Sequence, residues 1–588
     1  MNLSVASIAA LTAACGADDP ASSPSYGAHD AHDAHDHGGH VLSAEAGDCQ
    51  TFGSSYEAIQ KLIFERNGCT ASACHGEAKV GGLDLRAEAS WENLVDAPSA
   101  NSRLARVQPG TATDSFLYQK LRAASEPGSV QIAGSPMPVG TSPLTANELE
   151  AIQIWIKQGA PKTGTVADKT RGIDVGGLLD ACLPPVKPTR TKPLEPPAPD
   201  EGVQLRLPVY MLKANSEIEQ CTPFAYDLTK QVPAAYKDEA RNVLFVNGSR
   251  VRQDSQSHHL VLWNPKKALT SVPAGEAGWT CRGGTRAGQR CEARNGGADC
   301  GEGSVCAGKS TPGTLCGLDT TAIASGNIFT PEALAGIFEI FAGGGLPAQI
   351  ANTQSPQQYT PPLDGVFSEI PLKGILWFNS HAFNLTDEDT ELEARVNYFY
   401  AKDRKREMRP VNVAENNWIA DGQAPFTRKT YCKKHVVPLN HSLAMMTGHT
   451  HRRGEHFWVT DAAKKKIYES FDYNDAEYRH YTPWLEFTSP NNADRTLEYC
   501  ATFNNGLTKD DKPDLNLVTR KSRMPSGTSC VPTACVAGKV TAACKTNAEC
   551  DSAPGRGDGS CDACPIKGGQ TTENEMFVMM PWYVLPAK

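Results

Sequence analysis

The chain lacks a basic excess of charge and, beyond its N-terminus, lacks any long apolar run. Its 588 residues carry a formal net charge of −9 and the pI is near 6.0, which gives no electrostatic basis for binding nucleic acid. No stretch of about 18 apolar residues follows the N-terminus, so no segment there predicts a membrane-spanning helix. The length is too great for one hydrophobic core and predicts two to four domains.

Cysteine, in contrast, is abundant. Nineteen cysteines, many of them in tight clusters, predict disulfides and therefore an exported protein that is periplasmic or on the cell surface. Residues 1–15 predict a signal segment, because a short apolar run ends at Cys15 and resembles the cleavage site of bacterial lipoproteins. An ordinary secretory signal is the alternative. A lipid on Cys15, which would anchor the protein to the outer membrane, is the one membrane link that the sequence offers.

Residues 16–48 are rich in Ala, Ser, Asp, Gly and His without apolar periodicity, so they predict a disordered tether. Five histidines lie among aspartates in this tether: His29, His32, His35, His37 and His40. Imidazole and carboxylate together suit divalent copper or zinc, so the tract either gathers metal or is a solvated polar linker. The second interpretation is slightly favoured, because the tract has no fixed geometry.

Residues 49–168 predict a small helical domain with a haem site. An apolar helix runs into Cys69-Thr70-Ala71-Ser72-Ala73-Cys74-His75, and a Cys pair followed at once by His is typical of covalent c-type haem. Bacterial haem domains with this longer Cys spacing resemble the segment. Met137, in a Met-Pro step, is the expected second iron ligand, and a capping box at 145–148 opens a helix similar to the last helix of cytochrome c. A Cys69–Cys74 disulfide beside an incidental histidine is the alternative.

Residues 169–201 predict an extended linker, since seven prolines lie between Pro184 and Pro199. A Cys49–Cys182 disulfide would tie together the ends of the helical domain, although connectivity cannot be read from sequence. From Gly202 onward the pattern changes to short alternating strands with Gly, Pro and Asn turns, which predicts antiparallel sandwiches. The expected halves are 202–405 and 406–588.

Each half carries a Cys-rich insert, at 279–317 and at 528–566. The runs Cys281-x9-Cys291-x8-Cys300-x5-Cys306 and Cys535-x8-Cys544-x5-Cys550-x10-Cys561 look like two versions of one Gly-rich module. Neither insert contains histidine, and Cys561-x-x-Cys564 is the one pair with the short spacing of a zinc site. Disulfide-stapled loops are therefore favoured over zinc, and each bridge would stabilise the fold by roughly 2–4 kcal/mol.

Histidines form three short motifs in the β region, and a Glu-Met pair follows near the end of the chain. The motifs are His258-His259, His381 and His449-Thr450-His451, followed by Glu575-Met576. Histidines two residues apart on a strand share one face and can bind one metal ion, whereas adjacent histidines need a bulge or twist to do so. In this order the motifs resemble the copper type II monooxygenases, the family of peptidylglycine hydroxylases and dopamine β-hydroxylases.

The resemblance covers roughly Gly202 to the end and implies two jelly-roll-like halves with two copper ions per chain. One copper would be bound by the first triad, which we define as His258, His259 and His381. The catalytic copper would be bound by the second triad, which is His449, His451 and Met576, because a soft thioether prefers Cu(I), the state that binds O2. The expected fold class is a small all-α cytochrome c-like domain followed by all-β tandem jelly-roll-like sandwiches with disulfide loops inserted.

The implied reaction is hydroxylation of a substrate C–H bond by O2, with two electrons from outside. In the relatives these come from ascorbate or a similar reductant, and here an electron-transfer protein could deliver them through the haem domain. Peptide-amidating members have Arg where this chain has Thr447 and Cys where it has Phe577. Amidation of glycine-extended peptides is therefore disfavoured, Cys500 has either another partner or a free thiol, and the substrate is an unidentified small organic molecule or peptide.

Two other classes compete with the oxygenase. A non-catalytic exported protein that binds copper or transfers electrons would use the same histidines, and Met576 is the residue that favours the enzyme. A zinc hydrolase is the weaker competitor, because neither histidine pair has a Glu at the spacing of His-Glu-x-x-His.

Overall fold

The computed structural model describes most of the chain beyond the tether. It covers residues 49–127, 130, 132–168, 173–313, 316, 348–353, 356–384, 386–411, 413–414, 422–471, 473, 476, 478–508, 510–524, 529–568 and 573–587. The predicted signal segment with Cys15 and the His-rich tether with His29, His32, His35, His37 and His40 lie outside these residues. Within the described residues no helix is long and apolar enough to cross a membrane.

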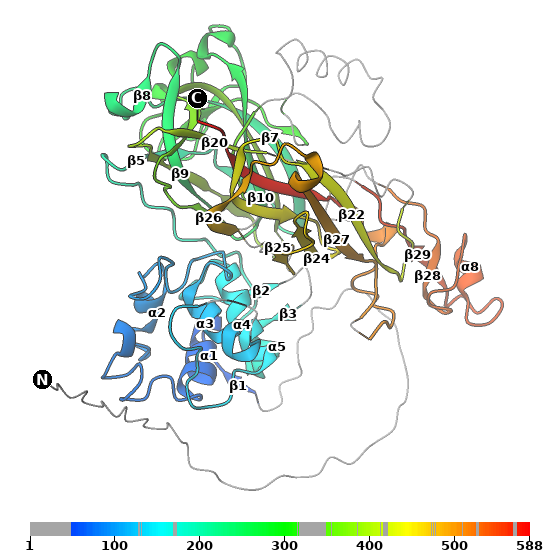
Figure 1. Cartoon of the computed structure of the whole chain (residues 1–588). Coiled ribbons are helices and arrows are strands. Elements are labelled where there is room, and N and C mark those ends of the chain that lie inside the picture. The colour runs from blue at the N-terminus through cyan, green and yellow to red at the C-terminus, as the bar shows by residue number, and fades with distance from the viewer. Residues whose placement is uncertain are drawn as a thin grey trace, which may run out of the picture.

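The first segment of the chain is helical (Figure 1). Its elements are α1 (Ser55–Ile59), η1 (Gln60–Glu65), η2 (Val80–Gly82), α2 (Ser90–Leu94), α3 (Phe116–Ser125), α4 (Ala146–Lys157), α5 (Val175–Leu179) and the short strands β1 (Gln50–Thr51), β2 (Ala167–Asp168), β3 (Ile173–Asp174) and β4 (Ala181–Cys182). The predicted capping box is confirmed, because Thr145 and Glu148 exchange side-chain and backbone hydrogen bonds at the start of α4. The predicted Cys49–Cys182 disulfide is confirmed as well. Because α5 packs into the same core, the helical segment reaches Cys182, beyond the expected limit at 168.

The rest of the described chain is mostly β-sheet, as predicted. One sheet has the order β11-β12-β7-β17-β10-β14, with β13 beside β7. Its strands are β7 (Ser216–Asp227), β10 (Ser257–Lys267), β11 (Thr280–Arg282), β12 (Val305–Ala307), β13 (Thr311–Pro312), β14 (Ala348–Thr353) and β17 (Lys373–Asn384). We call it the first sheet.

A second, larger sheet has the order β26-β23-β30-β20-β16-β9-β19-β5, with β8 and β15 beside β9 and β21 beside β30. Its strands are β5 (Gly202–Arg206), β8 (Lys237–Asp238), β9 (Val243–Gln253), β15 (Gln357–Thr360), β16 (Val366–Pro371), β19 (Ala394–Tyr400), β20 (Arg406–Pro410), β21 (Val413–Ala414), β23 (His441–His449), β26 (Arg479–Phe487) and β30 (Val578–Val584). We call it the shared sheet, because it contains strands from both expected halves of the β region.

The join between the halves lies at β20, which pairs parallel with β16 and antiparallel with β30. In the first half, residues of both sheets fill one core, for example Phe224 and Leu262 from the first sheet with Val246 and Tyr398 from the shared sheet. In the second half the shared sheet packs against a third one of order β22-β27-β24-β25. Those strands are β22 (Arg428–Val436), β24 (Gly454–Thr460), β25 (Lys466–Ser470) and β27 (Thr496–Asn504). Each half is thus a two-layer sandwich, and the shared sheet runs through both sandwiches.

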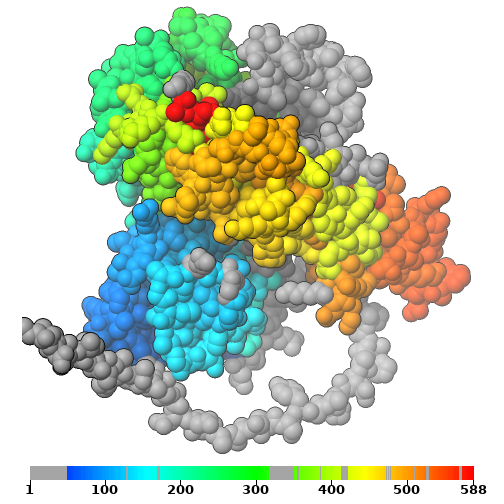
Figure 2. All heavy atoms as spheres, viewed as in Figure 1, coloured from blue at the N-terminus to red at the C-terminus, as the bar shows by residue number. Residues whose placement is uncertain are grey.

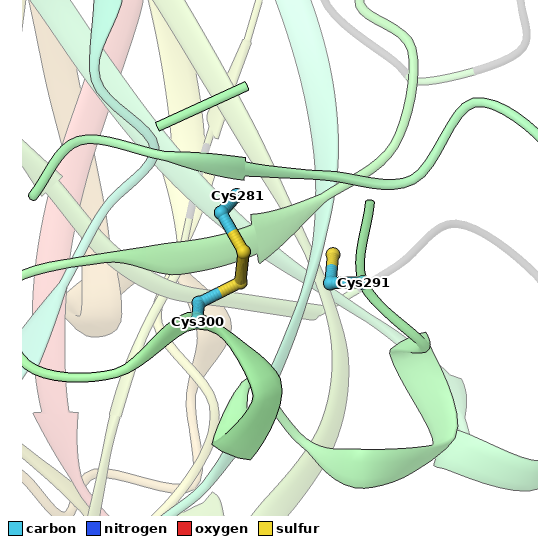
Figure 3. Close-up of side chains that lie close together, drawn as sticks. All are labelled: Cys281, Cys291 and Cys300. Atoms are coloured by element: carbon cyan, nitrogen blue, oxygen red, sulfur yellow. A yellow bond between two sulfur atoms is a disulfide. The ribbon is translucent and has the colours of Figure 1, made fainter. Parts of the chain in front are cut away.

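The two Cys-rich inserts have the same disulfide pattern, which confirms the predicted repeat. In each, the first cysteine pairs with the third and the second with the fourth: Cys281–Cys300 and Cys291–Cys306, then Cys535–Cys550 and Cys544–Cys561. The thiols of Cys281, Cys291 and Cys300 lie close together (Figure 3), but the first and last form a disulfide rather than a zinc site. Cys561 and Cys564 likewise enter two different disulfides.

The insert of the first half extends the first sheet through β11 and β12. The insert of the second half, with β28 (Ala534–Ala537), α8 (Asn547–Cys550) and β29 (Ser560–Ala563), projects from the body of the molecule (Figure 1). The remaining bridges are Cys221–Cys316, Cys432–Cys500 and Cys530–Cys564, so Cys500 has a partner on β22. Disulfides in this number are compatible with an exported protein.

A buried ion pair joins the helical segment to the β region, and the two parts lie against one another in Figure 2. Arg252 on β9 is 4% exposed and donates two hydrogen bonds, of 2.7 and 3.1 Å, to the carboxylate of Asp96. Nearby, Thr111 donates to the carbonyl of Gln357 at 2.7 Å. The Pro-rich linker between the parts is held at Asp254, which accepts from the backbone of Thr191 at 2.9 Å. The helical segment is therefore docked at a fixed place.

Replacing Asp96 by Asn should loosen this docking. The backbone of Asp96 is in the left-handed region, with φ of 57°, which Asn tolerates, so the change mainly leaves the buried guanidinium of Arg252 without its counter-charge. Breaking such a pair costs roughly 3–5 kcal/mol. We expect faster cleavage of residues 183–199 in limited proteolysis. Glu92→Gln, which removes an exposed pair with Lys162, is the control, and equal cleavage rates in both variants would contradict the role of Asp96.

Candidate metal centre

The first triad lies on two paired strands of the first sheet. His259 on β10 is directly opposite His381 on β17. The ladder is irregular between Ser257 and His259, so His258 has no register partner on β17. This irregularity is the bulge or twist that adjacent histidines were predicted to need, and it lets both rings face His381. The ring centroids are 5.5 Å apart for His258 and His259, and 5.2 and 5.1 Å from each to His381.

His449 and His451 lie at the end of β23 in the shared sheet. His449 is the last residue of the strand and is opposite Val578 on β30. His451 follows in a turn that Glu575 fixes, because its carboxylate accepts from the backbone N–H groups of His451 and Arg453 at 2.9 and 2.7 Å. The two rings are 5.1 Å apart, as predicted for histidines that share one face.

All five predicted histidines meet in one cluster. Across the two triads the centroid of His258 is 6.4 Å from that of His449 and 6.0 Å from that of His451, and His259 is 6.0 Å from His449. These separations are only slightly longer than those within each triad. His258, His381, His449 and His451 are buried, and His259 is partly buried. Segments nearly 200 residues apart in sequence thus build one imidazole-lined centre, which we call the histidine cluster.

Met576 is part of the segment that reaches the histidine cluster. The carbonyl of Asn574 bonds to the ring of His451, and Val578 pairs with His449, so the backbone on both sides of Met576 is anchored to the pair. Its partly buried side chain packs against an apolar group that includes Tyr478 and Val578. This contact places the thioether beside the strands that carry the histidines.

Hydrogen bonds fix the tautomers of two rings. The Nε2 atom of His381 is 2.7 Å from a carboxylate oxygen of Glu217, so it carries the proton and donates it, and Nδ1 keeps the lone pair. In His451 the roles are reversed, because Nδ1 donates to the carbonyl of Asn574 at 3.0 Å and Nε2 keeps the lone pair. In histidines that bind metals, the ring nitrogen that does not bind the metal usually donates a hydrogen bond in this way.

Burial favours the neutral form of two rings of the cluster. Desolvation, and then the neighbouring imidazoles, hold the pKa of His259 and of His449 well below the usual value of 6.5. Burial alone would also lower the pKa of His381, but the hydrogen bond to Glu217 and the charges of Glu219 and Glu217 raise it. Burial raises the pKa of Glu575 to about 8, against the opposing effect of its bonds to Arg453 and His451. Neutral imidazole is the form that binds metal.

The donor set of the histidine cluster fits copper. The Nδ1 atoms of His259 and His381 are buried without a hydrogen-bond partner, and a buried polar atom in that state costs free energy unless a ligand satisfies it. Imidazole suits copper, and a thioether next to it selects Cu(I). Within the described residues, the first triad offers three imidazoles, and the second offers two imidazoles with Met576 in the adjoining segment.

The predicted haem residues lie in the helical segment. Cys69 and Cys74 belong to none of the eight disulfides of the described chain, so the alternative of a bond between them is wrong. The Nδ1 atom of His75 donates to the carbonyl of Val80 at 3.0 Å, and the backbone of Leu83 also interacts with this ring. Cys69 and Met137 both pack against the helical core, and burial raises the pKa of the Cys69 thiol to about 11. These residues fit the demands of a covalent haem.

A cleft joins the helical segment to the histidine cluster. Its volume is about 710 Å³ with its open mouth included. Lys157 and Thr165 line it from the helical side, Thr189 from the linker, and His258 and Phe383 from the first sheet. Solvent or a small molecule therefore reaches the cluster along the join between the two parts of the chain.

Sequence reasoning missed several residues around the histidine cluster. Glu217 is far from every histidine in sequence, and its strand shows no motif. Tyr473, whose ring is 5.9 Å from that of His258, lies in an irregular stretch. In the sequence Glu575 is marked only by its place beside Met576. The nearby ion pair between Arg453 and Glu573, with a bond of 2.5 Å, joins residues 120 positions apart.

Comparisons with known proteins do not assign the chain to a family. No family model and no curated protein matches it. Among solved structures, the major capsid protein P2 from bacteriophage PM2 aligns over 50% of this chain and 96% of its own, with 7% identity and a TM-score of 0.16. The PBSX exported protein XepA aligns over 55% and 95%, with 10% identity and a TM-score of 0.12. Scores this low carry no argument about fold or function.

Replacing Glu575 by Ala should destabilise the second half. The change removes a buried acceptor from two backbone N–H groups, and a buried donor left without a partner costs roughly 1–3 kcal/mol. We expect the unfolding midpoint of the copper-free protein to fall by several degrees in thermal unfolding. The control is Glu388→Gln, an exposed carboxylate that pairs with Lys187. If both variants unfold at the wild-type temperature, Glu575 does not hold the turn.

Proposed function

We propose that the protein is an exported copper-dependent monooxygenase that hydroxylates a C–H bond with O2 and receives electrons through a fused c-type haem domain. The observation that carries the proposal is the histidine cluster, because five histidines from three distant motifs converge in a buried site with two unsatisfied ring nitrogens. The order of these motifs resembles the copper type II monooxygenases, whose tandem jelly-roll-like halves would correspond to 202–405 and 406–588.

The two triads have different tasks in this proposal. The first triad presents three imidazoles and no sulfur, which suits a centre that stores and passes electrons. The second triad is proposed to use His449, His451 and Met576 as catalytic ligands, since two nitrogens and a weak sulfur leave a position open. Copper would supply one-electron redox chemistry and O2 activation. The chain itself excludes bulk water from the buried rings and fixes the turn of His451 through Glu575.

The proposed haem would be bound by Cys69, Cys74, His75 and Met137. The two thiols would form the covalent links, and His75 and Met137 would bind the iron. The docked position of the helical segment supports electron delivery, because residues of that segment line the same cleft as His258. A separate electron-transfer protein, or an ascorbate-like reductant, would then act as the external donor. The proposed site is periplasmic or on the cell surface, with a lipid on Cys15 as one means of attachment.

The substrate is proposed to be a small organic molecule or peptide that is not recognised by an arginine before the His-x-His motif. Thr447 occupies that position and is fully buried, with its hydroxyl donating to the carbonyl of Gly448 at 3.5 Å and its backbone paired with Met580 on β30. It therefore cannot bind the carboxylate of a peptide, which argues against amidation of glycine-extended peptides.

A non-catalytic protein that binds copper or transfers electrons is the second candidate, because the histidine cluster would serve it equally well. The presence of Met576 two residues before Val578, which pairs with His449, favours the enzyme, because a thioether ligand suits the Cu(I) that must meet O2. O2 consumption with added reductant, even without substrate, would support the oxygenase, and its absence in copper-loaded protein given both ascorbate and reduced haem would support the second candidate.

Elemental analysis should find two copper ions per chain in protein expressed in the periplasm. His381→Ala and His451→Ala should each lower the copper content to about one, because each removes a ligand from a different triad. His441→Ala is the matched control, since it lies at the opposite end of the same strand as His449. Zinc in place of copper, or unchanged copper content in both triad variants, would contradict the assignment.

Haem attachment and its link to the cluster can be tested together. Wild-type protein should give the pyridine haemochrome spectrum of a covalent haem, and Cys74→Ser should alter it. For the stopped-flow test, the protein is first reduced, freed of excess reductant and then mixed with O2. The haem should reoxidise at least about tenfold more slowly in His381→Ala than in wild type or His441→Ala, because the first triad is the proposed acceptor of the haem electrons. An unchanged rate would contradict the relay while leaving the haem assignment intact.

A further inference from the structure

Two rings of the histidine cluster, one in each triad, have hydrogen-bond partners of different charge. His381 donates from Nε2 to the carboxylate of Glu217 at 2.7 Å, whereas His451 donates from Nδ1 to the carbonyl of Asn574 at 3.0 Å. A carboxylate carries a full negative charge and a carbonyl carries none. The two triads therefore differ in their surroundings as well as in their ligands.

The position of Glu217 follows from the pairing of β7 with β17. His381 is opposite Glu219 and Phe383 is opposite Glu217, so Glu217 is the diagonal neighbour of His381 on the same ladder, within reach of a long side chain. The ring of His381 is 1% exposed, and the side chain of Glu217 is 28% exposed. The carboxylate is thus partly exposed while its partner is buried.

Hydrogen bonding to a charged acceptor changes the imidazole as a ligand. It holds the proton on Nε2, directs the Nδ1 lone pair of His381 away from Glu217, and makes that nitrogen a stronger electron donor. Charge-assisted hydrogen bonds are roughly twice as strong as neutral ones. Glu219 adds a second negative charge near the ring. The ring of His451 donates to a backbone carbonyl instead, and the carboxylate near this residue, that of Glu575, accepts from its backbone N–H.

We propose that Glu217 is a positioning residue that orients His381 and gives the first triad a stronger preference for Cu(II) over Cu(I) than the second triad has. This inference rests on the proposed function, in which both triads bind copper. Strong nitrogen donation favours the higher oxidation state at the first triad, and the thioether of Met576 with a neutral acceptor on His451 favours the lower one at the second. The direction of electron flow between the triads would then be set by a residue outside either ligand set.

Copper affinities in a background with one working triad test the role of Glu217. In His451→Ala protein, Glu217→Gln keeps an acceptor for Nε2 and removes the charge. The dissociation constant for Cu(II) should rise about tenfold, within the 10–100-fold range for such partners, and that for Cu(I) less than twofold. Both are measured by competition with chelators, and a tenfold change in their ratio is a 59 mV shift for one electron. Glu217→Ala should raise the Cu(II) constant further.

A matched control comes from another histidine–carboxylate pair. His456 donates from Nε2 to the carboxylate of Glu469 at 2.8 Å. The side chain of Glu469 is 32% exposed, and the ring of His456 stacks on Trp458 and Phe471. Because His456 belongs to neither triad, Glu469→Gln should leave both copper affinities unchanged.

The outcomes separate the two proposals. If the wild-type protein binds two copper ions and the Glu217 variants keep the wild-type ratio of Cu(II) to Cu(I) affinity, this inference is wrong and the proposed function stands. An equal loss of both affinities would show only a packing role and would also overturn it. Wild-type protein that binds no copper would overturn the proposed function and this inference with it. Glu217→Gln is nearly isosteric, and its thermal unfolding reports whether it folds as wild type does.

Discussion

The constraint on which the structure depends is the packing of five imidazoles, four of them buried and that of His259 partly buried, with neighbouring ring centroids 5.1–6.4 Å apart. Neutral rings in a desolvated site must be held in chosen orientations, because buried ring nitrogens without partners cost free energy. Local structure alone cannot impose that arrangement. The irregular ladder at Ser257–His259, the carboxylate of Glu217 and the turn fixed by Glu575 each set the direction of one or two rings.

The arrangement of sheets explains how distant motifs meet. The first sheet supplies His258, His259 and His381, and the shared sheet supplies His449 at the end of β23. On the shared sheet an apolar group that includes Val366, Met408 and Val578 joins strands of both halves. Because β20 pairs with β16 on one side and β30 on the other, the halves form one continuous sheet rather than two domains on a hinge. The distances between the triads are thereby fixed by backbone pairing within the shared sheet and by the packing of the first sheet against it.

The helical segment and the disulfides act on the same centre from outside. The Arg252–Asp96 pair and the anchored linker keep the helical segment against the cleft that reaches His258. The Cys-rich insert of the first half extends the first sheet and is braced by the Cys221–Cys316 bond on β7, the strand that also carries Glu217. Covalent closure of these loops limits the freedom of the strands next to the cluster.

The sequence by itself determined the β-rich class, the repeated cysteine module, the capping box of α4 and the identity of the cluster histidines. These features depend on local spacing, alternation and ligand chemistry, which short segments already contain. The continuous sheet across the halves, the merging of both triads into one cluster and the role of Glu217 were decided only by the tertiary structure. They depend on which strands pair and in what register, and such contacts between residues more than a hundred positions apart leave no periodic signal in a single chain.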